Sequence, residues 1–530
     1  MRFLSARRGQ LAVLALLAGV LCGCRGETAP AAAAGQRRPP LIVIGIDGGE
    51  WKVIRRLWSE GKLPNLKSIA DRGVAATLRT AYNSSPVIWT TIATGVTPPV
   101  HGITDFVVAT PQGDVPISSA VRKVPALWNM LSRTGRRVAV LGWWGSWPAE
   151  EVNGVNLTDR ALLDLEARVA PASYLPAFLV DLRRADADPG LFESDEAQRR
   201  DRVMARSAAK LAGQKYDLIL LYFRSPDIVS HNEWKYFEPE AFGPLDPREL
   251  AAHRDRIPRV YEAVDREIGR ILAAAPRDSN VLVLSDHGFH AAKREDLRVL
   301  LDMDAVLERL GYLVRRDGAV DFSRSRLYTY GTPDFQRSKM LRFALAGRER
   351  GGRVRPEERD GLRRRLEADL ATVTNDRGEP VFIVQDARRH RGEDGDFVVV
   401  VRQALVTPVL KVGGAPFREA VRGLGRISGT HTTSTNGIFL AAGPDIDPAA
   451  NLEGIHVHDI APTILYGLGL PVAEDFAGLP RTALFRGEFQ RTHPARTIRS
   501  WGKREQGGAA KSSKADQELL DELRALGYIR

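Results

Sequence analysis

The stretch Leu41-Ile-Val-Ile-Gly-Ile46, which runs directly into Asp47, decides the fold. Six consecutive apolar or small residues that end at an acidic residue are typical of a strand buried on both faces of a parallel sheet. Similar runs recur at 137–141, 218–223 and 281–284. Stretches with helical character separate them, at 125–134, 196–213 and 250–274. Strands that alternate with helices predict an α/β fold, a three-layer α/β/α sandwich around a mostly parallel central sheet.

The alternation breaks down between residues 291 and 428, where the sequence becomes rich in arginine and in turn-forming residues. We interpret 291–428 as an inserted cap subdomain, and a set of long surface loops is the alternative. A further core strand at 438–442 and a helix at 459–468 resume the pattern. The predicted core domain therefore comprises 41–290 and 429–490.

The C-terminal tail, 491–530, divides into two parts. Residues 503–514 contain few apolar side chains, which predicts disorder. Leucines at 519, 520, 523 and 526 then recur with helical spacing, so 517–526 is predicted to be a short amphipathic helix.

The N-terminus has the features of an export signal. Three arginines precede an apolar run at 11–21 that is too short to span a bilayer comfortably. The run ends in Leu21-Cys-Gly-Cys24, which resembles a bacterial lipobox, where cleavage would leave Cys24 to carry acyl chains. An ordinary signal peptide or an uncleaved anchor is the alternative. We predict a signal peptide at 1–23, a flexible tether at 24–40 and a membrane-anchored lipoprotein in the periplasm or at the cell surface.

Charge and cysteine content narrow the possible functions. The net charge is +11, to which residues 1–40 contribute +5 through six arginines and one glutamate, which leaves +6 for the rest. This excess is more typical of a solvated basic face than of a surface that binds anions or a membrane, and no nucleic-acid-binding motif is present. The two cysteines are Cys22 and Cys24. The folded part therefore has no disulfide, no thiolate metal site and no cysteine nucleophile.

Acidic residues and a histidine stand where the predicted strands end. Asp47 ends the first strand, Asp227 follows the strand at 218–223, and Asp286-His287 ends the strand at 281–284. Ligands of open α/β sheets bind beyond the carboxyl ends of the strands. We therefore expect these side chains to line one edge of the sheet.

Two further histidines belong to this group. His231 follows Asp227 by four residues, which places both on one face of a helix, and His431 precedes the strand at 438–442. Asp and His bind Zn²⁺ without sulfur, and carboxylate-rich sites also suit Mn²⁺ or Mg²⁺. Three Asp and three His suffice for two metal ions. Taken singly, Asp47 could instead cap a helix, and either histidine could be a hydrogen-bonded core residue.

The segment Ser84-Ser-Pro-Val-Ile-Trp-Thr-Thr-Ile-Ala-Thr-Gly95 supplies a candidate nucleophile. Pro86 suits the first turn of a helix, which predicts Ser85 at the N-cap with its hydroxyl near the positive end of the helix dipole. Phosphate and a serine alkoxide are both stabilised at such a position. A serine that only caps the helix is the alternative.

Several motifs occur in an order that resembles a known family. They are Ile44-Gly-Ile-Asp-Gly48, the segment 85–95 followed by His101-Gly-Ile103, Pro226-Asp-Ile-Val-Ser-His231, Ser285-Asp-His-Gly-Phe289, Gly429-Thr-His431 and 458–465. From residue 41 to about 480 the chain resembles the type I phosphodiesterase and nucleotide pyrophosphatase branch of the alkaline phosphatase superfamily. The resemblance implies an alkaline-phosphatase-like fold and a hydrolase that cleaves phosphate esters, with phosphodiesters preferred.

The resemblance also implies roles for individual residues. The first metal ion would be bound by Asp47, Asp286, His287 and Ser85, and the second by Asp227, His231 and His431. Zinc is the preferred metal, with manganese and magnesium as alternatives. Ser85 would attack phosphorus in line and form a phosphoseryl intermediate, with no histidine acting as general base. Ser84 is the alternative nucleophile because it adjoins Ser85.

Two departures from the family pattern bear on the substrate. Nucleotide-cleaving members usually have a threonine nucleophile, whereas this chain has Ser85 followed by Pro86. They also have an asparagine after the His-Gly-Ile segment that binds a phosphate oxygen, and Asp105 occupies that neighbourhood. Because aspartate would repel phosphate, nucleotides are disfavoured. Asp105 and Trp144 are candidates for substrate contact, although a cluster of tryptophans is more often core packing.

Rival functions make different demands on the sequence. A sulfatase of this fold makes its nucleophile from a cysteine, which the folded part lacks, and a phosphomutase would be cytosolic. A transferase that moves phosphoethanolamine or phosphoglycerol onto envelope lipids or glycans differs only in its acceptor. A non-catalytic lipoprotein that binds through the same fold would be expected to have lost ligands, and none is missing. The expected partners are a phosphorylated small molecule, lipid or glycan as substrate, and the membrane through the lipid anchor.

Overall fold

The computed structural model describes most of the chain from residue 38 onwards. The residues outside the description are 1–37, 111–112, 187–195, 317–318, 331–333, 336–337, 387–395, 403–408, 433–434, 505–507, 526–527 and 529–530. The predicted signal peptide and Cys24 therefore lie outside the described residues. In the part that is described, no helix is both long and apolar enough to cross a bilayer.

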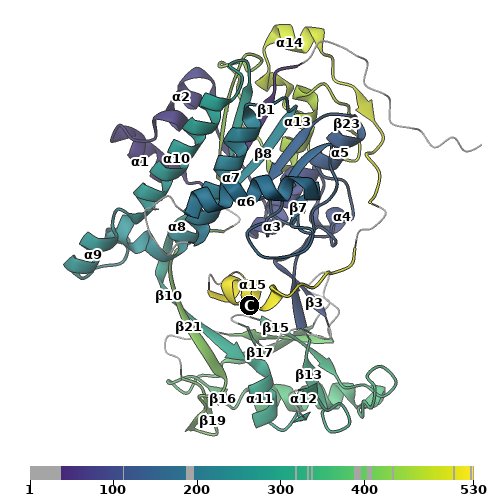
Figure 1. Ribbon diagram of the computed structural model, residues 1–530. Helices are drawn as coiled ribbons and strands as arrows, with labels where there is room; N and C mark the ends of the chain where they lie inside the picture. The colour runs from purple at the N-terminus through teal and green to yellow at the C-terminus, as the bar shows by residue number, and fades with distance from the viewer. Residues whose placement is uncertain are drawn as a thin grey trace, which may run out of the picture. The chain divides into compact units, whose positions relative to one another are not determined.

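A mixed eight-stranded sheet forms the centre of the fold (Figure 1). From edge to edge its strands are β2 (Val74–Leu78), β22 (Gly437–Ala442), β9 (Asn280–Leu284), β1 (Leu41–Ile46), β8 (Leu218–Phe223), β5 (Val138–Leu141), β6 (Gly154–Leu157) and β7 (Val169–Ala170). The five strands from β9 to β6 are parallel neighbours, while β22 and β7 run antiparallel to their partners. All six residues of β1 are buried, as a strand between two parallel neighbours requires. The predicted α/β fold with a mostly parallel central sheet is confirmed.

Two hydrophobic cores lie on opposite faces of this sheet. Ile42, Ile44 and Ile46 point into one core, and Leu41 and Val43 into the other. The first is covered by α1 (Trp51–Ser59), α2 (Pro64–Arg72), α6 (Leu175–Asp186), α7 (Glu196–Ala212), α8 (Ser225–Phe237) and α10 (Arg256–Ala274). The second is covered by α3 (Ser85–Thr94), α5 (Leu127–Arg133), α13 (Ile460–Gly467) and α14 (Gly487–Thr492). The three-layer arrangement is therefore confirmed.

A segment that the sequence predicts to be one helix contains parts of two helices. The stretch 250–274 contains the end of α9 (Pro247–His253) and all of α10, which begins at Arg256. Pro258 explains the break, because its ring has no N–H and would clash with the carbonyl of residue 254 in a continuous helix.

A long antiparallel ribbon leaves the sheet and leads to a third hydrophobic core. Its strands, β10 (His290–Asp302) and β21 (Val421–Thr430), pair from His290 opposite Thr430 to Leu301 opposite Val421. The third core contains residues of α11 (Met303–Arg309), α12 (Arg359–Leu370), β13 (Leu327–Thr329), β15 (Ser338–Phe343), β17 (Phe382–Asp386) and β18 (Phe397–Val401). A separate core supports the interpretation of 291–428 as an inserted subdomain, and its limits stay a prediction.

The predicted disorder of 503–514 is wrong for the residues described there. Arg504 donates its backbone N–H to the Lys123 carbonyl at 3.0 Å, and Gly508 donates to the Ala120 carbonyl at 2.8 Å. Arg504 and Gly508 are held in place although their surroundings in the sequence are polar, because hydrogen bonds to the main chain of the core domain replace the missing apolar contacts.

The predicted C-terminal helix is confirmed and lies on the core domain. Helix α15 (Asp516–Ala525) packs Leu520 and Leu523 against Phe106, and Asp516 lies 3.5 Å from the Arg160 guanidinium. In Figure 1 this helix, drawn in yellow, lies beside β3 (Val107–Thr110).

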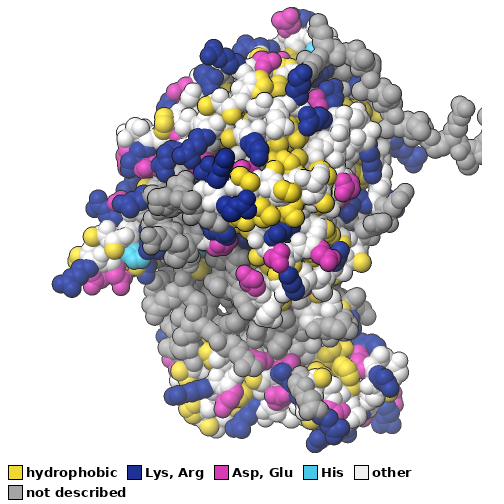
Figure 2. Space-filling model, viewed as in Figure 1, with side chains coloured by type: hydrophobic (Ala, Val, Ile, Leu, Met, Phe, Trp, Pro, Cys, Tyr) yellow, Lys and Arg dark blue, Asp and Glu magenta, His cyan; other side chains and the backbone are white. Residues whose placement is uncertain are grey.

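Charged side chains are mixed on the face that Figure 2 presents. Lys and Arg side chains are spread over it among Asp and Glu side chains. This distribution fits the solvated basic face that the modest net charge favours.

Candidate metal centre

The carboxyl ends of three neighbouring strands bring the predicted ligands together. Asp47 follows β1 and Asp286 follows β9, while α8, which begins directly after β8 and Arg224, carries Asp227 in its first turn. His231 lies one turn further along α8, and His431 follows the end of β21. Parallel register places these ends at one edge of the sheet, as the sequence predicts.

Asp47, Asp286 and His287 form one cluster. Each offers a ligand atom, and these atoms all lie within 4.8 Å of one another. The Nε2 atom of His287 is 3.2 Å from Oδ2 of Asp286 and 3.8 Å from Oδ1 of Asp47. All three side chains are buried.

Asp227, His231 and His431 form a second cluster with ligand atoms within the same distance of one another. Nε2 of His231 is 3.6 Å from Oδ1 of Asp227. The clusters adjoin, because the His431 ring stacks on the His287 ring at 3.6 Å and Oδ1 of Asp227 is 3.9 Å from Nε2 of His287. This spacing suits two ions about 4 Å apart.

Hydrogen bonds fix which nitrogen of two histidines carries the proton. Nδ1 of His287 lies 3.1 Å from the Gly288 carbonyl, and Nδ1 of His231 lies 3.0 Å from the Gly429 carbonyl. A carbonyl oxygen only accepts, so both Nδ1 atoms are donors. Each Nε2 therefore turns its lone pair toward the carboxylates, as a metal ligand does.

The carboxylates lack partners for several oxygens. Oδ1 of Asp47, both side-chain oxygens of Asp227 and Oδ2 of Asp286 accept no hydrogen bond from the described residues. Burial and the charge of Asp47 raise the pKa of Asp227 and of Asp286 well above the ordinary value. Buried anionic oxygens without donors fit divalent cations.

Ser85 adjoins the first cluster. Its hydroxyl is buried, and its Oγ lies 3.2 Å from Nε2 of His287. The predicted cap position is wrong by one residue, because Ser84 has extended backbone angles and is the N-cap, whereas α3 begins at Ser85. Ser84 makes no cap hydrogen bond with its side chain.

Tyr222 on β8 is a site residue that the sequence analysis missed. Its hydroxyl donates to Oδ2 of Asp47 and accepts a hydrogen bond from Nε1 of Trp144 at 2.6 Å. Burial and the charge of Asp47 raise the pKa of Tyr222 well above its ordinary value, so the hydroxyl stays a donor. A single hydroxyl near the end of an otherwise apolar strand was the available signal.

The two candidates for substrate contact have different surroundings. Trp144 is partly buried and reaches the first cluster through Tyr222. Asp105 is exposed, and its carboxylate accepts the N–H of Phe106 at 2.8 Å in a local turn. Trp143, by contrast, is core packing, since its ring meets Trp89 edge-on at 5.1 Å.

Glycines permit close backbone approaches at both clusters. Gly48 has a φ of +62° and donates its N–H to Oδ1 of Asp286 at 3.2 Å. A Cβ on Gly429 would stand 2.1 Å from the carbonyl oxygen of Ser230, so only glycine allows β21 to pass α8 here.

A family model and several solved structures match this chain. A family model described as type I phosphodiesterase / nucleotide pyrophosphatase matches residues 41–405. A search of curated proteins found no match. The chain is similar to a solved structure of murine ectonucleotide pyrophosphatase/phosphodiesterase 5 in complex with AMP, with 15% identity, a TM-score of 0.48 and coverage of 85% of this chain and 100% of that one. It is also similar to phosphonoacetate hydrolase from Sinorhizobium meliloti in complex with phosphonoformate, with 16% identity, a TM-score of 0.45 and coverage of 81% and 95%.

Proposed function

The chain belongs to the type I phosphodiesterase and nucleotide pyrophosphatase family, metal-dependent hydrolases of phosphate esters, and on that premise we propose that it is an exported phosphodiesterase with Ser85 as its nucleophile. The observation that carries the proposal is the position of Ser85, whose Oγ lies 3.2 Å from His287 beside carboxylates with unsatisfied oxygens. The hydroxyl of Ser84, the alternative nucleophile, makes no hydrogen bond within the described part of the chain.

The two clusters would hold two divalent ions. We assign the first to Asp47, Asp286, His287 and Ser85 and the second to Asp227, His231 and His431. When bound, the ions supply positive charge that activates the serine hydroxyl and stabilises the departing oxygen. The mixed Asp and His donor set favours zinc, with manganese or magnesium as alternatives.

The reaction divides into two displacements at phosphorus. Ser85 Oγ attacks, loses its proton and forms a new P–O bond while the ester P–O bond breaks and one alcohol leaves. Water then attacks the phosphoserine, which restores the Ser85 hydroxyl and releases a phosphomonoester. Nε2 of His287 turns its lone pair toward Ser85, and its burial lowers its pKa, so the ring stays neutral and suits a ligand rather than an acid.

Replacement of Ser85 tests the proposal. We expect Ser85→Ala to lower kcat for bis-p-nitrophenyl phosphate by roughly a thousandfold or more, because the nucleophile is lost, while most of the bound metal is retained through the three remaining ligands of the first ion. Ser84→Ala is the matched control and should keep most of the activity. Equal activity of wild type and Ser85→Ala would disprove the assignment, and a swap of the two effects would favour Ser84.

The acceptor distinguishes a hydrolase from a transferase. With bis-p-nitrophenyl phosphate and added glycerol or ethanolamine, a hydrolase releases p-nitrophenol and p-nitrophenyl phosphate as its main products. A transferase would instead yield the mixed diester of the added alcohol, which mass spectrometry separates. Metal analysis of the same purified protein should find about two equivalents of a divalent ion.

We also propose export and lipidation at Cys24. The export-signal pattern of residues 1–23 and the tether at 24–40 support this, and both precede the sheet that begins at Leu41. Expression of the full chain in bacteria with labelled palmitate should label wild type and Cys22→Ala but not Cys24→Ala. Label on Cys24→Ala would contradict the assignment.

A further inference from the structure

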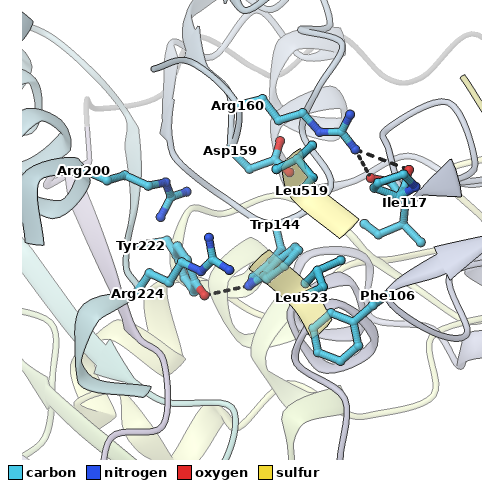
Figure 3. Close-up of a pocket in the computed structure, with 11 residues that line it drawn as sticks. Phe106, Ile117, Trp144, Asp159, Arg160, Arg200, Tyr222, Arg224, Leu519 and Leu523 are labelled. Carbon is cyan, nitrogen blue, oxygen red and sulfur yellow. Dashed lines mark hydrogen bonds between the residues drawn. The ribbon is translucent and has the colours of Figure 1, made fainter. Parts of the chain in front are cut away.

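A small pocket adjoins the proposed metal centre. It is a cavity of about 40 Å³ whose walls include Phe106, Trp144, Tyr222, Arg200, Arg224 and Leu523 (Figure 3). Tyr222 belongs to both sites, because its ring lines the pocket and its hydroxyl donates to Asp47. The pocket therefore lies one side chain away from the first cluster.

Arg200 brings a buried guanidinium with spare hydrogen-bond donors to this pocket. Its side chain is 7% exposed, and one Nη2 hydrogen bond, to the Gly142 carbonyl at 2.6 Å, holds it in place. Its Nε and Nη1 donate to none of the residues that the structure describes. Guanidinium stays protonated in proteins, so a buried one with spare donors calls for an anion.

A second guanidinium lies nearby. Arg224, which also lines the pocket, stands with its guanidinium carbon 5.5 Å from the Trp144 ring centroid, and that of Arg200 is 5.3 Å from the Tyr222 ring centroid. Figure 3 shows both groups near Tyr222. Two positive charges around one cavity attract an anion more strongly than either alone.

The acidic side chain at this pocket is already occupied. Asp159 lines it, but its carboxylate accepts backbone N–H groups from Gly145, Ser146 and Trp147 at 2.8 to 3.2 Å. The third guanidinium of the lining, that of Arg160, donates to the Ile117 carbonyl at 2.7 Å and faces Asp516 of α15. Arg200 therefore keeps two side-chain donors, Nε and Nη1, for a ligand.

The remaining walls limit what can enter. Leu519 and Leu523 of α15, together with Phe106, make the other side of the pocket apolar. A volume of about 40 Å³ holds a few water-sized groups, which suits a carboxylate or a phosphoryl group and is too small for a nucleobase.

We infer that this pocket binds a second, compact anionic group of the substrate. The inference rests on the proposed function and narrows it: the preferred substrate is a small phosphate ester that also carries a carboxylate or a second phosphate. Arg200 is the main determinant of this preference, Arg224 assists, and the apolar wall from α15 disfavours neutral polar groups in the same place.

Binding of matched phosphonates to the metal-loaded enzyme tests the inference. Calorimetry compares ω-carboxyalkylphosphonates of increasing chain length with alkylphosphonates of the same length, and bisphosphonates serve as a third arm that identifies the preferred anion. At the best length we expect wild type to bind the doubly anionic ligand at least about tenfold more tightly, as a charge-assisted hydrogen bond implies. Absence of such a preference at every length would overturn the inference.

Variants locate the effect. Arg200→Gln keeps a donor for Gly142 and should abolish the preference while binding the plain alkylphosphonate as before. Arg199→Gln is the matched control, since Arg199 pairs with Glu196 at 3.0 Å one position earlier on α7. Arg224→Gln should lower the preference in part and replaces Arg200→Gln if that variant fails to fold. A preference that survives in Arg200→Gln or, where that variant does not fold, stays undiminished in Arg224→Gln would reject the site.

The two proposals fail in different ways. If no alkylphosphonate binds and bis-p-nitrophenyl phosphate is not cleaved, the proposed function is wrong. If alkylphosphonates bind and bis-p-nitrophenyl phosphate is cleaved, but a second anionic group does not increase affinity, the proposed function stands and the pocket does not bind that group.

Discussion

The hydroxyl of Tyr222 donates a hydrogen bond to Oδ2 of Asp47, which leaves Oδ1 of that carboxylate as the oxygen without a hydrogen-bond donor. The same hydroxyl accepts from Nε1 of Trp144. A metal ligand oriented by a neighbouring donor is held in one direction before the ion arrives. Tyr222 is therefore a positioning residue for Asp47.

Removal of this hydroxyl should weaken metal binding. We expect Tyr222→Phe to raise the dissociation constant of the more weakly held divalent ion by about tenfold or more, because the orientation of Asp47 is lost. Competition with a chromogenic chelator measures it. Tyr236→Phe is the control, since the Tyr236 hydroxyl also faces a carboxylate, Glu249 at 3.2 Å, and has no contact with the clusters among its described bonds. Equal losses in both variants would contradict the role of Tyr222.

Gly429 should tolerate no side chain. The Cβ of Gly429→Ala would meet the Ser230 carbonyl oxygen at 2.1 Å, so β21 or α8 must move, and the bond from His231 to the residue 429 carbonyl moves with them. We expect a loss of about 1–3 kcal/mol in the free energy of unfolding and a lower affinity for one of the two ions. Denaturant titration and metal analysis check the two effects. Gly378→Ala is a control, because a Cβ there meets no atom within 4 Å, although its φ of +80° carries a backbone cost of its own. A smaller loss at 429 than at 378 would refute the steric account.

Stability should fall in mild acid through His101. Burial lowers the pKa of His101 from 6.5 to about 3, and its Nδ1 accepts the N–H of Ile103 at 3.1 Å, which only a neutral ring can do. Between these pKa values the unfolded chain binds a proton that the folded chain does not, so stability decreases as pH falls below 6.5. The loss from this residue is about 2 kcal/mol at pH 5. Thermal unfolding of wild type and His101→Gln from pH 7 to pH 5 measures it, and a variant with the same pH slope as wild type would exclude His101 as a source.

The C-terminal segment should restrict access to the second cluster. The Tyr528 ring stacks on Phe106 at 4.7 Å and meets the His231 ring at 5.3 Å. We expect Tyr528→Ala to raise kcat/KM for a bulky diester relative to a small one by roughly fivefold, since an obstructing ring is removed. The ratio of rates for bis-p-nitrophenyl and methyl p-nitrophenyl phosphate reports it. An unchanged ratio would show that Tyr528 does not limit entry.

The sequence alone was enough to group the residues at the strand ends, but it did not reveal the hydrogen bonds that orient them. Asp47, Asp227 and Asp286 could be placed at one edge because parallel strands share their direction. The role of the Tyr222 hydroxyl could not be predicted, because its hydrogen-bond partner depends on β1 and β8 being neighbours in the sheet. The pocket at Arg200 was equally out of reach, because α7, the loop that carries Trp144, and α15 meet only in three dimensions.

Two errors have local causes. The N-cap of α3 was placed at Ser85 rather than Ser84, because Pro86 fits either the first or the second position of a helix. The tail at 503–514 was predicted to be disordered from its composition, but Arg504 and Gly508 are fixed by main-chain bonds that composition does not report. The apolar content of a segment indicates how much of it can be buried, but it does not reveal order that arises from hydrogen bonds.

The ribbon of β10 and β21 has an evolutionary consequence. His290 and Thr430, which face each other at its base, directly adjoin the segments that carry His287 and His431. If 291–428 is the inserted subdomain that we predict, its two ends meet in this register, and its interior can change without moving the stacked imidazoles. Sequence changes within that subdomain would then leave the two clusters of predicted metal ligands in place.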